Sequence, residues 1–197
     1  MAVLKSVKEV IQMEWVNNRY MFDTCALNRI CLNPQDEMLI FQSKLQGWEY
    51  FFSEIQCRES CANIYKQSKD VDSNLVERER AEWALSLLRV IPKLQTQYVG
   101  LIATFRPAGW ILNGTYDILP DNEQNAVKLF SDILNNNDRQ YYNDAMIGMT
   151  AIVHGCIVIT NDERFYRKVN RHFPGRSIKY EAFIERVREF VDSAMQR

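Results

Sequence analysis

Apolar and polar residues follow two kinds of pattern along this chain. In some segments several β-branched or aromatic residues stand together, which is typical of buried strands. In others, apolar residues recur every three or four positions, which is typical of helices with one face on a core. We expect strands at residues 19–23, 50–53, 110–112, 156–160 and 177–180. We expect helices at residues 3–15, 26–32, 37–45, 54–67, 75–94 (ending near Pro92), 121–134 and 182–195. Strands that alternate with helices predict an α/β protein with a mostly parallel sheet of four or five strands.

The clearest pattern lies in residues 143–165. Residues 145–153 are apolar on nearly all sides, and a short apolar run at 156–160 follows Gly155. This predicts a buried helix that has Asn143 as its N-cap and ends at Gly155. The run after the glycine predicts a strand that is covered on both faces.

Four acidic residues stand where these elements meet one edge of the predicted sheet. A helix of about eleven residues and a strand of about five each span ~16 Å, so the strand at 156–160 returns to the edge at which the preceding helix begins. Asp144, in the first turn of that helix, and Asp162, just after the strand, therefore end at the same edge. Asp23 ends the first strand, and Glu59 lies early in the helix after the second strand, so both can lean over this edge.

The chemistry of four clustered carboxylates predicts a metal site. Carboxylates that crowd together raise one another's pKa, and a divalent cation removes this penalty. Ligands that offer only oxygen favour a hard ion, so we expect Mg²⁺ or Mn²⁺. Such an ion supports phosphodiester hydrolysis, because it polarises the phosphate and lowers the pKa of a bound water. Taken singly, each acid has an ordinary alternative, as a helix-capping, loop or exposed residue, and only their joint placement favours the metal site.

Composition limits the classes of function. The formal net charge of −1 gives no sign of general affinity for nucleic acid, so such contact needs a local patch. Five cysteines without a CxxC pair indicate a reducing compartment, and we expect a cytoplasmic protein with no membrane association. Cys57 and Cys61 lie one helical turn apart. With only two histidines in the chain, they are better explained as small buried apolar residues than as zinc ligands.

The residues around the four acids resemble those of a known family, the PIN-domain nucleases. The strongest likeness is the segment from Asn143 to Phe165, which has that family's order of acid, helix, glycine, strand and Thr-x-Asp-x-x-Phe. Phe22-Asp23-Thr24 resembles the family's acid–threonine pair after the first strand, and residues 53–59 resemble its serine-to-glutamate spacing. Cys25 departs from the family, many of whose members have Asn or Ser at this position.

This resemblance implies a fold, an activity and a set of site residues. The fold would be a three-layer α/β sandwich, and the activity that of a Mg²⁺- or Mn²⁺-dependent endoribonuclease, often the toxin of a toxin–antitoxin pair. RNA would then be the substrate, and an antitoxin protein would be a partner. The metal-binding and catalytic acids would be Asp23, Glu59, Asp144 and Asp162. The residues that support them would be Thr24, Thr160 and Asn161.

The resemblance also implies how the chain is organised. We expect a single domain, residues 1–197, whose core consists of about 19–67 and 121–180. The N-terminal helix at 3–15 is additional, and the insertion at about 68–120 is longer than in compact members of the family. The insertion has more apolar residues than a solvated segment needs, so we expect part of it to pack on the sheet as extra core and part to form the interface of a homodimer.

One candidate for nucleic-acid contact is a basic helix face. From Arg164 to Tyr180 the chain has six basic residues and no acidic one. We expect a short helix from about Phe165 to Phe173, and four of the basic residues fall on one of its faces: Arg164, Arg167, Lys168 and Arg171. Two interpretations stay open, a solvated helix face and a surface that contacts RNA phosphates beside the metal. We expect Glu163, next to the site, to be exposed.

Two other classes of function also stay open. A phosphotransferase that forms an aspartyl phosphate also has an acid such as Asp23 after its first strand, but it usually has a second acid two residues later, where this chain has Cys25. A non-catalytic binding module on the same fold would keep the core and lose acids from the set. The presence of all four acids counts against this second alternative.

Overall fold

The computed structural model describes residues 18–53, 55–56, 59, 85–87, 89–94, 97–98, 121–134 and 141–196. The expected helix at 3–15, the expected strand at 110–112 and the pair Cys57 and Cys61 lie outside these residues. None of the helices in the described ranges has both the length and the apolar character that crossing a bilayer requires.

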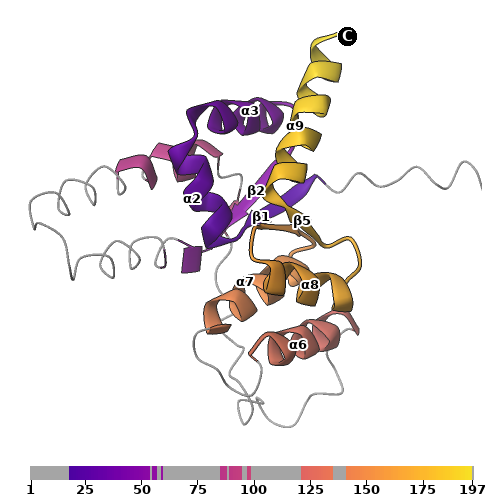
Figure 1. Ribbon diagram of the computed structural model, residues 1–197. Helices are drawn as coiled ribbons and strands as arrows, with labels where there is room; N and C mark the ends of the chain where they lie inside the picture. The colour runs from indigo at the N-terminus through magenta and orange to yellow at the C-terminus, as the bar shows by residue number, and fades with distance from the viewer. Residues whose placement is uncertain are drawn as a thin grey trace, which may run out of the picture.

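The centre of the described fold is a sheet of five strands in the order β3-β2-β1-β4-β5 (Figure 1). Its strands are β1 (Arg19–Phe22), β2 (Glu49–Phe52), β3 (Gln97–Tyr98), β4 (Ile157–Thr160) and β5 (Ser177–Lys179). Every neighbouring pair is parallel. β4 is buried at all four positions and lies between β1 and β5, which confirms the prediction of an interior strand. β3 was not predicted, because a strand of two residues is too short to show a period.

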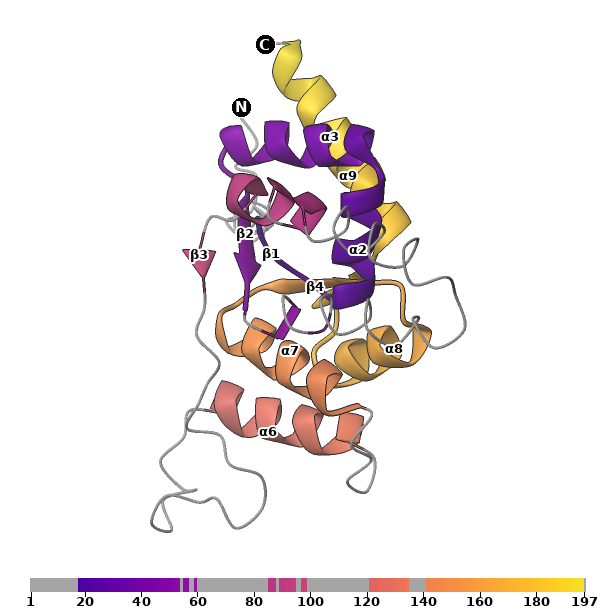
Figure 2. The same cartoon turned by 90° about the vertical axis from the view of Figure 1, so that its left-hand side faces the viewer.

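Helices cover both faces of the sheet, which confirms the three-layer α/β fold (Figures 1 and 2). On one face lie α2 (Thr24–Leu32), α3 (Pro34–Leu45), the helical residues 85–87 and 89–94, and α9 (Tyr180–Met195). On the other lie α6 (Asp121–Leu134), α7 (Tyr142–Val153) and α8 (Glu163–His172), with α6 on the outer side of α7 (Figure 2).

The alternation of side chains along the strands produces two separate cores. In β1, Tyr20 and Phe22 belong to the core under α2, α3 and α9, whereas Met21 belongs to the core under α7. All three side chains are fully buried. A strand with both faces covered in this way shows a continuous apolar run, and this is why the strand positions could be predicted from the sequence.

Several predicted boundaries were wrong by a few residues, for reasons of local chemistry. α2 begins at Thr24 because the Asp23 carboxylate caps its first turn. α3 begins at Pro34, since Asn33 accepts hydrogen bonds from the next turn and proline suits the first helical position. The helix predicted at 75–94 extends past Pro92, where we expected the stop, to Leu94, which is the end of the predicted range and is fully buried in the core. Tyr180 begins α9 and is not part of the last strand.

The unit formed by α7 and β4 has the predicted shape with one correction. Gly155 has a φ of 68° after the helix end and turns the chain into β4, as expected. The N-cap of α7, however, is Tyr141, without a side-chain hydrogen bond, and the prediction that Asn143 is the N-cap was wrong. Asn143 lies in the first turn, and its side chain is engaged elsewhere. Because β4 runs back along α7, Asp144 and Asp162 lie at the same edge of the sheet.

Candidate functional site

The structure brings the four predicted acids together at the carboxyl-terminal edge of the sheet. Asp23 follows β1, Asp162 lies two residues after β4, Asp144 is in the first turn of α7, and Glu59 is in the short helical stretch after β2. The negative charges of Asp23, Asp162 and Glu59 all raise the pKa of Asp144, in that order of strength. Four acids that are distant in sequence therefore form one electrostatic cluster.

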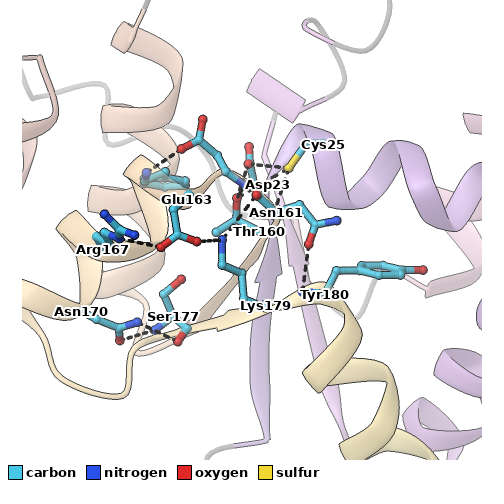
Figure 3. Close-up of polar contacts among 12 residues, drawn as sticks. Asp23, Cys25, Thr160, Asn161, Glu163, Arg167, Asn170, Ser177, Lys179 and Tyr180 are labelled. Atoms are coloured by element: carbon cyan, nitrogen blue, oxygen red, sulfur yellow. Dashed lines mark hydrogen bonds and ion pairs between the residues drawn. The ribbon is translucent and has the colours of Figure 1, made fainter.

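Asp23 is held in one orientation by donors from both central strand ends (Figure 3). Its Oδ1 accepts from the backbone N–H of Thr24 at 2.6 Å. Its Oδ2 accepts from Thr160 Oγ1 at 2.7 Å and from Cys25 Sγ at 3.0 Å. Burial raises the pKa of this carboxyl, which is only 4% exposed, and the three donors lower it. Thr24 and Thr160 thus make the contacts that were expected of them.

Cys25 is a contributor that the sequence reasoning did not assign to the site. Besides donating to Asp23, its Sγ accepts from the backbone N–H of Asn161 at 3.3 Å and lies 3.6 Å from Thr160 Oγ1. Burial, followed by the charge of Asp23, raises the pKa of the thiol to about 12, so the thiol keeps its proton and can donate. The cysteine therefore provides a hydrogen bond to Asp23 although it replaces the expected Asn or Ser.

Glu59 is bound by two donors from two different helices. Its Oε2 accepts from Thr24 Oγ1 at the beginning of α2, and its Oε1 accepts from Asn143 Nδ2 at 2.6 Å in the first turn of α7. The segment that bears Glu59 is anchored by Gln56, which is fully buried and donates to the carbonyl oxygen of Phe22 at 3.0 Å. Sequence reasoning missed Asn143 and Gln56, because their partners lie far away along the chain.

Asp144 and Asp162 differ from the first two acids. Within the described ranges, no hydrogen bond or ion pair reaches the side chain of Asp144, and burial, followed by its acidic neighbours, raises its pKa to about 7. Asp162 is exposed and caps α8, because its Oδ1 accepts from the backbone N–H of Phe165 at 2.7 Å. Its own N–H donates to Thr160 Oγ1 at 2.9 Å, so one hydroxyl links Asp162 to Asp23.

The fit of this cluster to a divalent ion can be judged from its geometry and its donors. Among the residues that the structure describes, no group of three or more His, Cys, Asp or Glu side chains is arranged so that it could hold a metal ion. The donor chemistry nevertheless suits a hard cation, since the acids offer only oxygen and the charge of Asp144 is uncompensated. Asp23 and Glu59 are tied to protein donors, whereas Asp144 and the exposed Asp162 keep oxygens available for an ion.

The predicted basic face of α8 lies mainly against α6. Arg164 stacks on the ring of Tyr141, 3.3 Å from its centroid, and its Nη2 donates to the carbonyl oxygen of Ile133. Lys168, only 13% exposed, forms an ion pair with Asp132 on α6 at 3.2 Å. Arg171 lies 3.7 Å from the same carboxylate and is 68% exposed. The helical spacing was therefore right, but Arg164 and Lys168 serve the packing of α6 against α8.

A second set of polar contacts lies around Glu163, the first residue of α8 (Figure 3). Arg167 is 71% exposed and pairs with Glu163 at 2.6 Å. Glu163 also pairs with Lys179 at 2.8 Å, and its side chain is 54% exposed, as expected. Asn161 supports the acids only indirectly, through its N–H to Cys25, while its side chain lies beside Tyr180.

A groove of about 1110 Å³ opens at the opposite, amino-terminal edge of the sheet. It is lined by Arg19, Glu49, Ile157, Arg176 and Arg186, among others, and by none of the four acids. We assign the functional site to the acidic edge, because the pKa values of Asp23 and Asp144 are raised there by burial and by neighbouring acids. In the groove, by contrast, Arg19 and Glu49 form an ion pair at 3.0 Å.

Comparison with known proteins agrees with this assignment of the fold. The family model of the PIN domain matches residues 20–170, which is most of the chain and includes all four acids. No curated protein matches the sequence.

Proposed function

Since this chain belongs to the PIN-domain family, in which nuclease activity is general, we propose that it is a Mg²⁺- or Mn²⁺-dependent endoribonuclease. It hydrolyses RNA phosphodiester bonds at the edge formed by Asp23, Glu59, Asp144 and Asp162. The observation that carries the proposal is the half-buried carboxylate of Asp144, which no hydrogen bond or ion pair reaches among the described residues and whose pKa is raised by burial and by three other acids. A half-buried acid in this state is costly unless a cation or a catalytic role accounts for it.

Each acid has its own part in the proposed mechanism. Asp144 and Asp162 bind the ion directly, because their oxygens are the least engaged by protein donors. Asp23 keeps a fixed orientation, which three hydrogen bonds maintain, and its charge acts on Asp144 more strongly than that of Glu59. When bound, the ion supplies a polarised phosphate and a water of lowered pKa for in-line attack. The residues around it hold the carboxylates in place and need no movement during the reaction.

The RNA backbone contacts the exposed cations of α8, the helix that begins at the acidic edge beside Asp162. Arg167 and Arg171 are the members of the basic face that retain exposed side chains, at 71% and 68%. Both are paired only at the surface, where an ion pair contributes little and exchanges easily for a phosphate. Arg164 and Lys168 contribute to this contact indirectly, by fixing α8 on α6.

The biological setting belongs to the same proposal. The protein acts in the cytoplasm as a homodimer, and an antitoxin protein that covers the acidic edge controls it when it serves as a toxin. If the neighbouring reading frame encodes a small DNA-binding protein, this result would support the toxin role. If no such protein is encoded there and the purified protein still cleaves RNA, the nuclease activity stands and the toxin role is excluded.

The test is an assay of the purified protein on a generic RNA, with Mg²⁺, with Mn²⁺ and with a chelator. Release of phosphate from a small phosphoester is measured in parallel. We expect internal cleavage of RNA that requires the ion, and no release of phosphate. Release of phosphate without RNA cleavage would indicate a phosphotransferase or phosphatase, and binding of RNA without cleavage under all conditions would indicate a non-catalytic module.

A further inference from the structure

Asn143 directly precedes Asp144 and makes a contact that its position in the sequence does not suggest. Its Nδ2 donates to Glu59 Oε1 at 2.6 Å, across 84 positions of the chain. The other oxygen of the same carboxylate accepts from Thr24 Oγ1. Glu59 therefore links the beginning of α2 to the beginning of α7. Asp23 is the N-cap of α2, and Asp144 lies in the first turn of α7.

This bridge of two hydrogen bonds holds Glu59 beside other acids that repel its charge. The Glu59 charge raises the pKa of both Asp23 and Asp144, so Glu59 lies within electrostatic reach of both. A half-buried carboxylate in this position gains by turning towards water, away from the other acids. Hydrogen bonds from neutral donors to a carboxylate are short and strong, and the two donors hold Glu59 in the cluster without neutralising it.

The two donors have different consequences for the site. Thr24 is 6% exposed, and its backbone N–H binds Asp23, so it ties Glu59 to the first strand end. Asn143 lies on α7 next to Asp144, and its amide group fixes the first turn of that helix relative to Glu59. The amide is thus the one link between Glu59 and the helix that bears Asp144 within the described residues.

We infer that Asn143 is a positioning residue of the acidic site, which holds the Glu59 carboxylate across the beginnings of α2 and α7 and acts on the reaction through Glu59. This inference rests on the proposed function. It predicts that Asn143 and Glu59 are not independent. Loss of the amide lets Glu59 turn away, and once Glu59 is absent the amide has nothing left to hold.

A double-mutant cycle tests this dependence. The variants are Asn143→Ala, Glu59→Ala and their combination, and the readouts are Mn²⁺ affinity by calorimetry and the rate of RNA cleavage. We expect Asn143→Ala alone to weaken both by about 10- to 100-fold, the usual effect of removing a group that orients a metal ligand. In the Glu59→Ala background, Asn143→Ala should change the Mn²⁺ affinity by less than about twofold. Thr24→Val, which removes the other donor, should show the same pattern.

A matched control and a second variant keep the result interpretable. Asn125→Ala removes an exposed asparagine from α6, whose side chain accepts one long hydrogen bond from Lys128 at 3.4 Å, and it should leave both readouts unchanged. If Asn143→Ala does not fold, as judged by its metal-free melting temperature, Asn143→Ser takes its place in the cycle. Serine is well tolerated near a helix beginning but is too short to reach Glu59.

The outcomes separate this inference from the proposed function. Equal Mn²⁺ affinity and cleavage in Asn143→Ala and the parent, or losses that add fully to those of Glu59→Ala, would overturn the role of Asn143. If Asp144→Asn is inactive in the same experiment, the nuclease site itself stands and only the positioning role is lost. If neither the parent nor any variant binds Mn²⁺ or cleaves RNA, the proposed function fails first.

Discussion

At the scale of single residues, Asp144 is a half-buried acid whose carboxylate has no hydrogen bond or ion pair among the described residues. Burial and the charges of Asp23, Asp162 and Glu59 raise its pKa from 3.8 to about 7, and the charge of Arg164 offsets this only in part. In the absence of an ion, the folded protein therefore keeps a proton on Asp144 that the unfolded chain has already released. This difference makes the stability of the metal-free protein depend on pH.

The direction of this dependence follows from proton binding. Between pH 3.8 and about 7 the folded state binds more protons than the unfolded state, so the free energy of unfolding falls as the pH rises through this window. Above about pH 7 the contribution is constant and unfavourable. Asp144→Asn lacks this titration, so in a chelator its free energy of unfolding should fall less than that of the parent between pH 4.5 and 7.5. Urea denaturation of both proteins across this range measures the difference, and parallel curves would contradict the assigned burial of the charge.

Sequence patterns predicted the acids but not the residues that hold them. Asp23 and Asp162 could be predicted because each follows an apolar run, and a strand end fixes where the next residues lie. Cys25 and Asn143 could not, since their partners depend on how side chains meet after folding. The usual preference of asparagine for the N-cap pointed to the wrong role for Asn143, whose amide instead binds a carboxylate 84 positions away.

At the scale of elements, α7 carries the site because it is packed closely between the sheet, α6 and α8. Gly148 makes this packing possible: a Cβ on this residue would lie 2.9 Å from Phe165 Cε2 and 3.3 Å from Ile133 Cδ1. Phe165 and Ile133 are both fully buried, so neither side chain can move aside freely. β4 could be predicted because it is packed on both faces and is therefore a continuous apolar run. β3 could not, because two residues are too few to form a pattern in the sequence.

The close approach at Gly148 gives a prediction about stability. Gly148→Ala improves helix propensity by about 1 kcal/mol but crowds two buried side chains, which typically costs 1–3 kcal/mol. We expect a net loss of about 1 kcal/mol in the free energy of unfolding, measured by urea denaturation. Val153→Ala, at the exposed end of α7, is the control and should stay within about 0.5 kcal/mol of the parent. A more stable Gly148→Ala protein would show that α6 and α8 have room to separate from α7.

At the scale of the whole molecule, the described surface divides into an acidic edge, an opposite edge and an apolar outer side. On the side of α2, α3 and the helical residues 85–87 and 89–94, several large apolar residues are exposed, among them Leu32 (73%), Leu45 (71%) and Leu85 (66%). This side lies across the sheet from α7, so a partner that binds there leaves the outer side of α7 uncovered (Figure 2). Exposed apolar side chains that gather on one side are typical of an interaction surface.

This distribution leads us to expect a homodimer that uses the α3 side. Light scattering at high protein concentration should give the mass of two chains. Leu85→Glu should shift the protein towards the monomer, because it places a charge in the interface. Val153→Glu, on the opposite side of the sheet, should leave the mass unchanged. A monomeric parent protein at high concentration would contradict the interface.

The central claim is that the four acids form a nuclease site, and the rate of RNA cleavage by Asp144→Asn in saturating Mn²⁺ tests it most directly. The substitution keeps the shape of the side chain and removes one anionic oxygen donor, so the fold should be retained while the rate falls by about two to four orders of magnitude. Arg167→Ala is the matched control, since it removes an exposed cation next to the site. Its rate should fall only modestly, and the dependence of that rate on salt should become weaker. If Asp144→Asn cleaves RNA as fast as the parent in saturating Mn²⁺, the four acids are not the active site.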